Sequence, residues 1–184
     1  MAEAEKSTQA PRGRRDNRTT VMAETLIMVA LSAALSMVII YTLPQGGSVT
    51  MASMVPIFVL SMRRGPKVGI FAGACLGIIV LVITPFYYNP FEFLLDYPMA
   101  FGALGLSGFL GKWPVVGVGV GIGARFICHF VAGVLFFCSY NTTSMICPVY
   151  SAVYNAGYLI PEFFISAAVI SVLAWRNILT VPRR

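Results

Sequence analysis

Six ionisable side chains stand within or beside long apolar runs of the sequence. They are Glu24, Glu92, Asp96, Arg125, His129 and Glu162. A charged group inside a bilayer is costly, and it usually lines a site or pairs with another charge. With one histidine and no cysteine cluster, the chain lacks ligands for metal-dependent catalysis. It also lacks a phosphate-binding loop, because Trp113 follows Gly111-Lys112. The pattern therefore favours a binding site over an enzyme.

Four polar side chains are expected in the outer half of the membrane. Helical rise places Asp96 about 8 Å and His129 about 14 Å from that face. Tyr150 and Asn155 begin the last apolar run from the same side, at about 2 and 9 Å. Side chains from three helices would thus converge on a pocket that opens outward. Nearby aromatic residues supply its walls: Tyr87, Tyr88, Tyr97, Phe137 and Tyr154.

The residue types indicate the ligand's chemistry. A carboxylate at Asp96 neutralises a cation, aromatic faces attract organic cations, and Asn155 offers a donor and an acceptor to a heterocycle. Structural alternatives stay open. Arg125 could pair with Asp96 or Glu162, His129 could be a satisfied core histidine, and Asp96 a simple ion-pair partner. Tyr150 and Asn155 could serve only as an interface and cap at the start of their helix. Tyr87 and Tyr88 could belong only to an interfacial aromatic belt.

The composition is that of an integral membrane protein. Of 184 residues, 58% are hydrophobic and 11% charged, and the mean hydropathy is +0.80. Soluble domains are about 45 to 50% apolar and about 25% charged. Soluble enzymes, extracellular disulfide scaffolds and nucleic-acid-binding domains are therefore excluded. Residues 1–20 hold eight of the 20 charged residues, and we expect them to form a disordered cytoplasmic tail.

Apolar runs separated by proline, glycine or charge predict an all-α bundle of six transmembrane helices. The expected ranges are about 21–43, 50–62, 66–84, 91–110, 114–138 and 149–176. A crossing needs about 20 apolar residues, so the second range is short. The six-helix membrane domain is expected over 21–176.

The basic residues orient this bundle. Twelve of the 13 Lys and Arg residues fall on one side of six crossings, including those of the basic tail 177–184. The opposite connections, about 44–49, 85–90 and 139–148, contain neither Lys nor Arg. The positive-inside rule then places both termini in the cytoplasm. Cys138 and Cys147 flank the last of these outer connections, where a disulfide would form if geometry and compartment allow.

Five stretches carry a resemblance to a known family. They are Leu43-Pro-Gln-Gly-Gly-Ser48, Arg63-Arg-Gly-Pro-Lys67, Leu94-Leu-Asp-Tyr-Pro-Met-Ala-Phe101, Arg125-Phe-Ile-Cys-His-Phe-Val-Ala-Gly133 and Tyr150-Ser-Ala-Val-Tyr-Asn155. Together they resemble the thiamine-specific substrate-binding component, the ThiT family, of energy-coupling factor (ECF) vitamin transporters. The resemblance covers nearly all of the chain after the tail.

The resemblance implies a multi-pass protein of the bacterial plasma membrane that holds thiamine near the outer face. It implies docking with a transmembrane coupling subunit and two cytosolic ATPases, since the chain has no ATPase of its own. Matched by position to the family, Asp96 is implied to be the acidic residue of the site, and His129 to contact a ring of the ligand. Phe137 is implied to be an aromatic contact of the ligand. Tyr150 and Asn155 form the pyrimidine-side pair.

Tyr97 is an expected neighbour of this site, and the outer loops near Gln45 and Tyr88 are expected to close over it. Some family members have Glu at the place of Asp96 and Trp at that of Phe137. Some also have a Trp in the first outer loop that this chain lacks. These departures bear on stacking and affinity more than on substrate class.

Ala30 and Ala34 resemble the small-residue signature by which such components meet their coupling subunit, although internal packing would use the same spacing. Three competing functions remain. The chain could bind another vitamin or a thiamine precursor, act alone as a proton-coupled carrier, or be an intramembrane enzyme using Asp96, Arg125 and His129.

Overall fold

The computed structural model describes residues 15–85, 91–137 and 146–179, and helices make up most of them. The helices are α1 (Arg15–Ser36), α2 (Val55–Arg64), α3 (Pro66–Ile83), α4 (Glu92–Leu94), α5 (Ala100–Ala103), α6 (Pro114–Ala132) and α8 (Ile146–Trp175). Tighter or wider helical turns are η1 (Pro44–Gly46), η2 (Leu95–Met99), η3 (Leu104–Leu110) and η4 (Gly133–Phe137). A hairpin of β1 (Ile39–Thr42) and β2 (Ser48–Thr50) completes the fold.

Five helical segments in the described residues are long and apolar enough to cross a membrane. They are Arg18–Ser36, Pro66–Ile83, Glu92–Leu110, Pro114–Phe136 and Cys147–Trp175. They match five of the six predicted spans, with boundaries that differ by up to seven residues. The remaining one, α2, has ten residues and is therefore only about 15 Å long.

The predicted first helix and tail need correction at both ends. Helix α1 begins at Arg15, so residues 15–20 are helical, whereas the prediction placed them in the tail. It ends at Ser36, and the predicted helical residues 39–43 instead lie mainly in β1, which pairs antiparallel with β2. Two adjacent isoleucines at the start of β1 favour a strand. Gly46, at a φ of 88°, adopts the left-handed conformation that the turn requires.

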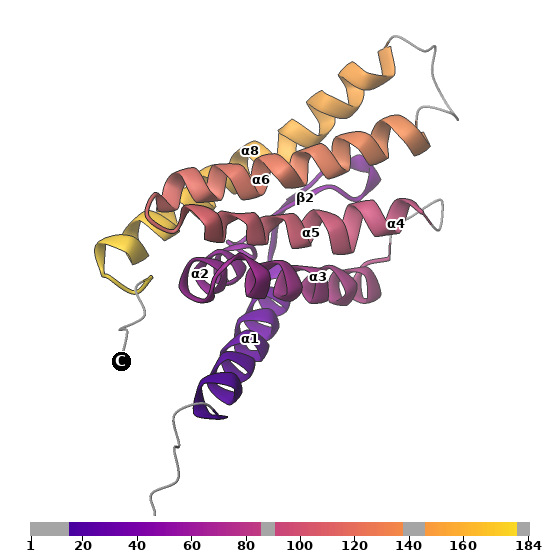
Figure 1. The fold of residues 1–184 in the computed structure, drawn as a ribbon. Coiled ribbons are helices and arrows are strands. Elements are labelled where there is room, and N and C mark those ends of the chain that lie inside the picture. Colours follow the sequence, from indigo (N-terminus) through magenta and orange to yellow (C-terminus); the bar gives the residue numbers. More distant parts are fainter. Residues whose placement is uncertain (1–14, 86–90, 138–145, 180–184) are drawn as a thin grey trace, which may run out of the picture.

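Helix α2 lies in the centre of the fold. All residues from Val55 to Ser61 are buried, and Ile57, Phe58 and Leu60 have no exposed surface. Figure 1 shows α2 enclosed among the longer helices, while α1 runs at an angle along the outside of α3. The short second span predicted from the sequence is thus an interior helix.

Glycines bring α3 close to the segment 91–110, as their spacing predicts. A Cβ at Gly105 would collide with the backbone of Gly69 and Ile70. A Cβ at Gly77 would collide with the carbonyl group of Tyr97. This contact fixes the backbone around Tyr97 next to the end of α3.

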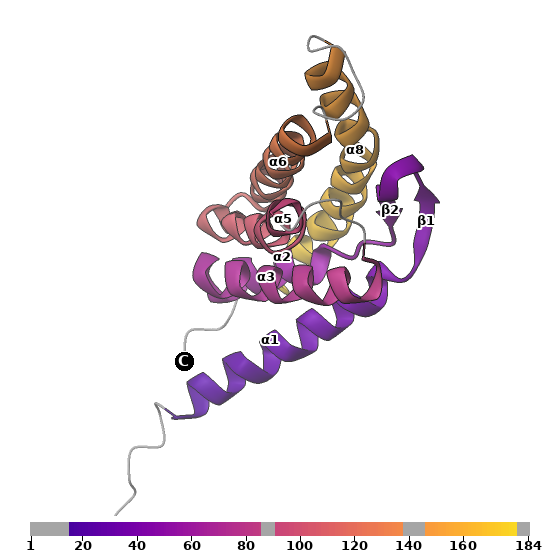
Figure 2. The ribbon, with the colours of Figure 1, turned by 90° about the vertical axis from the view of Figure 1, so that its right-hand side faces the viewer.

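A basic cluster, Arg63 and Arg64 with Glu24, marks one end of the bundle. The Glu24 carboxylate accepts hydrogen bonds from Arg63 at 2.8 Å and from Arg64 at 2.5 Å. Arg63 also donates to the carbonyl oxygen of Ile178 at 2.5 Å. The first half of α1, the end of α2 and the chain after α8 therefore meet at this end. The hairpin follows the other end of α1 and stands beside α8 (Figure 2).

Candidate functional site

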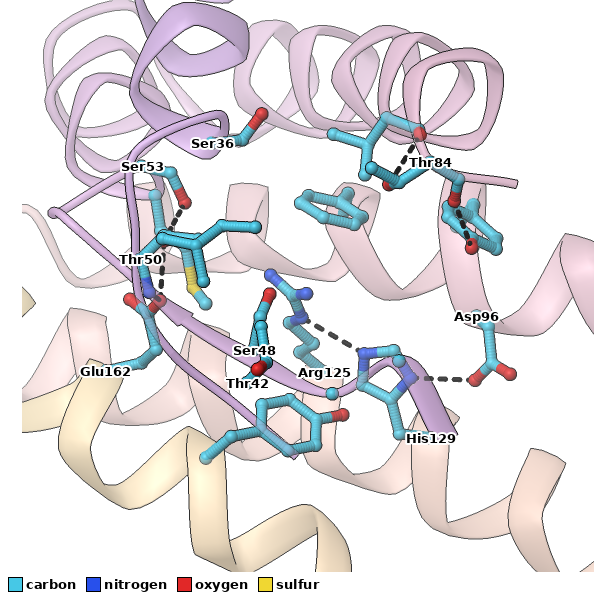
Figure 3. Close-up of a pocket in the computed structure, with 18 of the residues that line it drawn as sticks. Ser36, Thr42, Ser48, Thr50, Ser53, Thr84, Asp96, Arg125, His129 and Glu162 are labelled. Carbon is cyan, nitrogen blue, oxygen red and sulfur yellow. Dashed lines mark hydrogen bonds and ion pairs between the residues drawn. The ribbon is translucent and has the colours of Figure 1, made fainter. Parts of the chain in front are cut away.

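A cavity of about 540 Å³ lies at the hairpin end of the bundle. Its walls come from the hairpin, the ends of α1 and α3, and segments η2, α6 and α8. Polar groups project into it from several of these elements (Figure 3). A volume of this size is typical of small-molecule sites in proteins.

Asp96 and His129 meet at this cavity. The His129 Nδ1 lies 2.7 Å from the Asp96 Oδ1, and the Arg125 Nε donates to the His129 Nε2 at 3.1 Å. Because a guanidinium can only donate, Nε2 accepts and the ring hydrogen sits on Nδ1, from which it is donated to Asp96. His129 is therefore a neutral link between Arg125 and Asp96, as Figure 3 shows.

The local backbone helps to place Asp96. It lies in η2, a π-helical turn that contains Pro98. Proline lacks the N–H that a regular helix needs, and such wide turns are frequent at functional sites. The turn interrupts the helical segment just where it passes the end of α3.

Arg125 forms neither of the two ion pairs considered for it, with Asp96 or with Glu162, although all three residues are described. Its guanidinium carbon lies 3.9 Å from the centre of the Phe101 ring. Its Nη1 is buried and has no hydrogen-bond partner among the described residues. The aromatic face and His129 thus hold the guanidinium in the cavity wall.

Glu162 forms a second polar group on the opposite wall. Its Oε1 accepts hydrogen bonds from the Thr50 backbone N–H and side-chain hydroxyl, each at 2.6 Å. The Thr50 and Ser53 hydroxyl groups are also 2.6 Å apart. These contacts attach β2 and the residues after it to α8.

Tyrosines on α8 hold the remaining part of the hairpin. The Tyr154 hydroxyl donates to the Pro44 carbonyl at 2.5 Å and accepts the Gly47 N–H at 2.8 Å. Tyr158 donates to the Asn155 Oδ1 at 2.8 Å. Because the Asn155 Nδ2 donates to the Ser151 carbonyl at 2.9 Å, part of its hydrogen-bonding capacity is used within α8.

The cavity brings together four residues of the predicted site and separates one. Asp96, Tyr97, His129 and Asn155 line it. Tyr150 is 53% exposed, stacks on Tyr154 with a centroid distance of 6.1 Å, and is not among the described residues that line the cavity.

Three predictions concern residues that lie, wholly or in their side chains, outside the part of the chain that the structure describes. Phe137 ends η4, and its side chain is not described. Tyr88 lies outside the described residues. Cys138 does as well, so the possible disulfide with Cys147 falls outside them.

Sequence reasoning left several cavity residues out of the predicted site. Arg125 and Glu162 were considered as intramembrane charges, and their burial in an apolar segment was the signal that could have placed them there. Thr50 and Ser53 carried no such signal, because the hairpin was not predicted. Tyr158 was not singled out, because a tyrosine within an apolar helical run is no signal of a site.

The charges of the cavity suit a cation. In the described lining, two carboxyl groups, Asp96 and Glu162, stand against one guanidinium, Arg125. The hydrogen-bond pattern leaves His129 neutral. The described lining thus holds one more carboxyl group than guanidinium groups, together with the aromatic side chains of Tyr97 and Tyr158.

Comparison with known proteins agrees with the family predicted from the sequence. The model of the family described as thiamine transporter protein (Thia_YuaJ) matches residues 22–181. Thiamine transporter ThiT of Bacillus subtilis is 34% identical over 181 residues, covering 88% of this chain and 92% of that protein. Thiamine transporter ThiT of Lacticaseibacillus paracasei is 29% identical over 173 residues, covering 83% and 86%.

A solved structure of ThiT from Listeria monocytogenes has a similar fold. The TM-score is 0.79 at 24% sequence identity, and the match covers 90% of this chain and 100% of that chain. The family is one of non-enzymatic membrane transporters, so the chain is a multi-pass protein of the bacterial plasma membrane. The match of a family model to nearly the whole sequence, together with these relatives, shows that the chain belongs to the thiamine transporter protein (Thia_YuaJ) family.

Proposed function

We propose that this chain is the thiamine-binding component of an ATP-driven ECF transporter and captures thiamine in the cavity beside Asp96. The observation that carries the proposal is the Asp96 carboxylate, 2.7 Å from a neutral His129 in a cavity with one excess carboxylate. Thiamine is a flat organic cation, and carboxylates and aromatic faces both attract such a group. The names of the relatives support this ligand.

Direct binding tests the proposal. The purified chain in detergent is titrated with thiamine by calorimetry, with its pyrimidine fragment, riboflavin and biotin as competitors. We expect saturable binding of one thiamine per chain, with no displacement by riboflavin or biotin. Preferential binding of another vitamin or of the precursor fragment would instead assign the chain to a different substrate.

The proposed topology has six crossings with both termini in the cytoplasm. Helix α2 alone is too short to cross, but β2 and the residues before α2 return the chain from the hairpin end to the basic cluster. The contacts of Arg63 and Arg64 with Glu24 support this path. Basic residues gather at the cytoplasmic side of membrane proteins, so the hairpin and the cavity would face outward. Labelling of single cysteines from either side of the membrane tests this orientation.

Docking to a coupling subunit is proposed at α1. Ala30 and Ala34 are both exposed, which favours an external contact over internal packing. The spanning part of α1 is 11% buried, whereas the other four described spans are 28 to 39% buried. Two small residues one turn apart let another helix approach closely. In this proposal the cytosolic ATPases drive reorientation of the bundle through that contact.

The hairpin and the outer connection that contains Tyr88 are proposed to close over bound thiamine. Tyr154 already joins α8 to both sides of the turn at Gly46 through Pro44 and Gly47. Loop closure around a ligand excludes water and slows release. Faster dissociation after removal of the Tyr154 hydroxyl would support this step.

A further inference from the structure

Two residues that line the cavity each have one buried polar atom without a hydrogen-bond partner among the described residues. These atoms are the Glu162 Oε2 and the Arg125 Nη1. Glu162 is 1% exposed and Arg125 is 8% exposed. Buried polar groups are nearly always paired, because leaving one unpaired costs its full desolvation penalty. These two atoms are not used in the chain of hydrogen bonds that joins Arg125, His129 and Asp96.

The rest of each side chain is held firmly. The Glu162 Oε1 accepts two hydrogen bonds from Thr50. Arg125 donates from Nε to His129 and stacks on Phe101. In Figure 3, Glu162 and Thr50 lie on one side of the cavity, Asp96 lies on the other, and Arg125 and His129 lie between them. The unpaired oxygen and nitrogen are thus positioned before any ligand binds.

The two atoms have complementary chemistry. A carboxylate oxygen accepts a hydrogen bond, and a guanidinium nitrogen donates one. Glu162 would repel a phosphate or carboxylate group, and Arg125 would repel an ammonium group. A neutral group that both donates and accepts hydrogen bonds satisfies both residues. Asp96, on the other side of the cavity, remains available for a positive charge.

We propose that Glu162 and Arg125 form a second subsite that binds the neutral, hydrogen-bonding part of the ligand. This inference rests on the proposed function and adds a specificity-determining pair to it. Thiamine offers two groups of this chemistry, the aminopyrimidine edge and the hydroxyl of its side chain. Glu162 accepts a hydrogen from the group, and Arg125 donates one to it.

The test compares the full-length wild-type chain with Glu162→Gln, using three ligands. They are thiamine, oxythiamine, in which an oxo group replaces the amine, and a thiamine analogue without the hydroxyl. Glutamine keeps an oxygen for Thr50 but presents an NH₂ group in place of the free oxygen. We expect Glu162→Gln to weaken thiamine binding by about tenfold or more, as for loss of a charge-assisted hydrogen bond. It should leave unchanged the affinity for the analogue that lacks the contacting group, which identifies that group.

Thr50→Val is the matched control. It removes the Thr50 hydroxyl from the Glu162 Oε1 and leaves Oε2 in place. Any loss should therefore be the same for all three ligands. Unchanged thiamine binding by Glu162→Gln, or an equal loss for all three ligands, would overturn the subsite.

A further comparison needs no variant and so does not depend on the folding of Glu162→Gln. If both analogues bind the wild-type chain as tightly as thiamine does, the subsite is refuted. If one binds at least about tenfold more weakly, it is supported. Failure of the wild-type chain to bind thiamine would refute the proposed function and the subsite together. Thiamine binding that is indifferent to Glu162 would refute the subsite alone.

Discussion

Asp96→Asn isolates the charge at the centre of the proposed site. An asparagine has nearly the same shape, and its side-chain oxygen can still accept the Nδ1 hydrogen of His129, now 2.7 Å from Asp96. The substitution therefore removes the negative charge while it retains the hydrogen bond. Two unit charges about 5 Å apart interact by about 3 kcal/mol at an effective dielectric constant of about 20. Mutational values for contacts with charged groups are about 1.5 to 3 kcal/mol.

This range corresponds to a loss in thiamine affinity of about 10- to 150-fold. Calorimetric titration of the purified variant measures it. The control ligand is a neutral isostere of thiamine with an uncharged ring in place of the thiazolium, for which the loss should be much smaller. Unchanged thiamine affinity would show that Asp96 serves structure only. An equal loss for both ligands would show that the substitution disturbs the cavity rather than its charge.

Three further predictions concern the fold and its partners. Gly105→Val should destabilise the chain by about 1 to 3 kcal/mol, because the valine side chain would collide with the backbone of α3. The control Gly123→Ala, where no atom lies within 4 Å of the added Cβ, should leave the thermal unfolding midpoint unchanged. Equal midpoints for Gly105→Val and the wild type would contradict the close packing of Gly105 against α3. Ala30→Trp and Ala34→Trp, both at exposed positions, should each preserve thiamine binding and abolish thiamine uptake by cells that contain the coupling subunit and ATPases. Normal uptake by both variants would exclude this face of α1 from docking. Tyr154→Phe removes two hydrogen bonds to the hairpin. It should raise the dissociation rate of thiamine about tenfold, as for a loss of about 1.4 kcal/mol. Stopped-flow traces identical to those of the wild type would mean that these hydrogen bonds do not retain the ligand.

The long helices were predictable because hydropathy reports them directly. The expected range 66–84 differs by one residue from Pro66–Ile83, and 91–110 contains the span Glu92–Leu110. The hairpin was not predictable in the same way. Residues 37–43 are as apolar as the helix before them, and periodicity cannot distinguish a short strand from the end of a helix in such a run.

The site was predictable where a polar residue stands in an apolar helix. Helical depth predicted that Asp96 and His129 converge on one pocket, and the structure places them in contact. Glu162 was noted as an intramembrane charge, but its role depends on Thr50, a hairpin residue that no helical pattern could bring close. Tyr150 was also predicted in the outer half of the membrane and still lies outside the described cavity lining, because depth gives no information about the direction of a side chain on its helix.

We propose that the cavity between Asp96 and Glu162 holds thiamine. A structure of the full-length chain determined with thiamine tests it most directly. We expect thiamine in this cavity, with its positively charged ring within about 6 Å of the Asp96 carboxylate, the range over which opposite charges act strongly on one another. Thiamine bound elsewhere, or bound here with its charged ring turned away from Asp96, would refute this proposal.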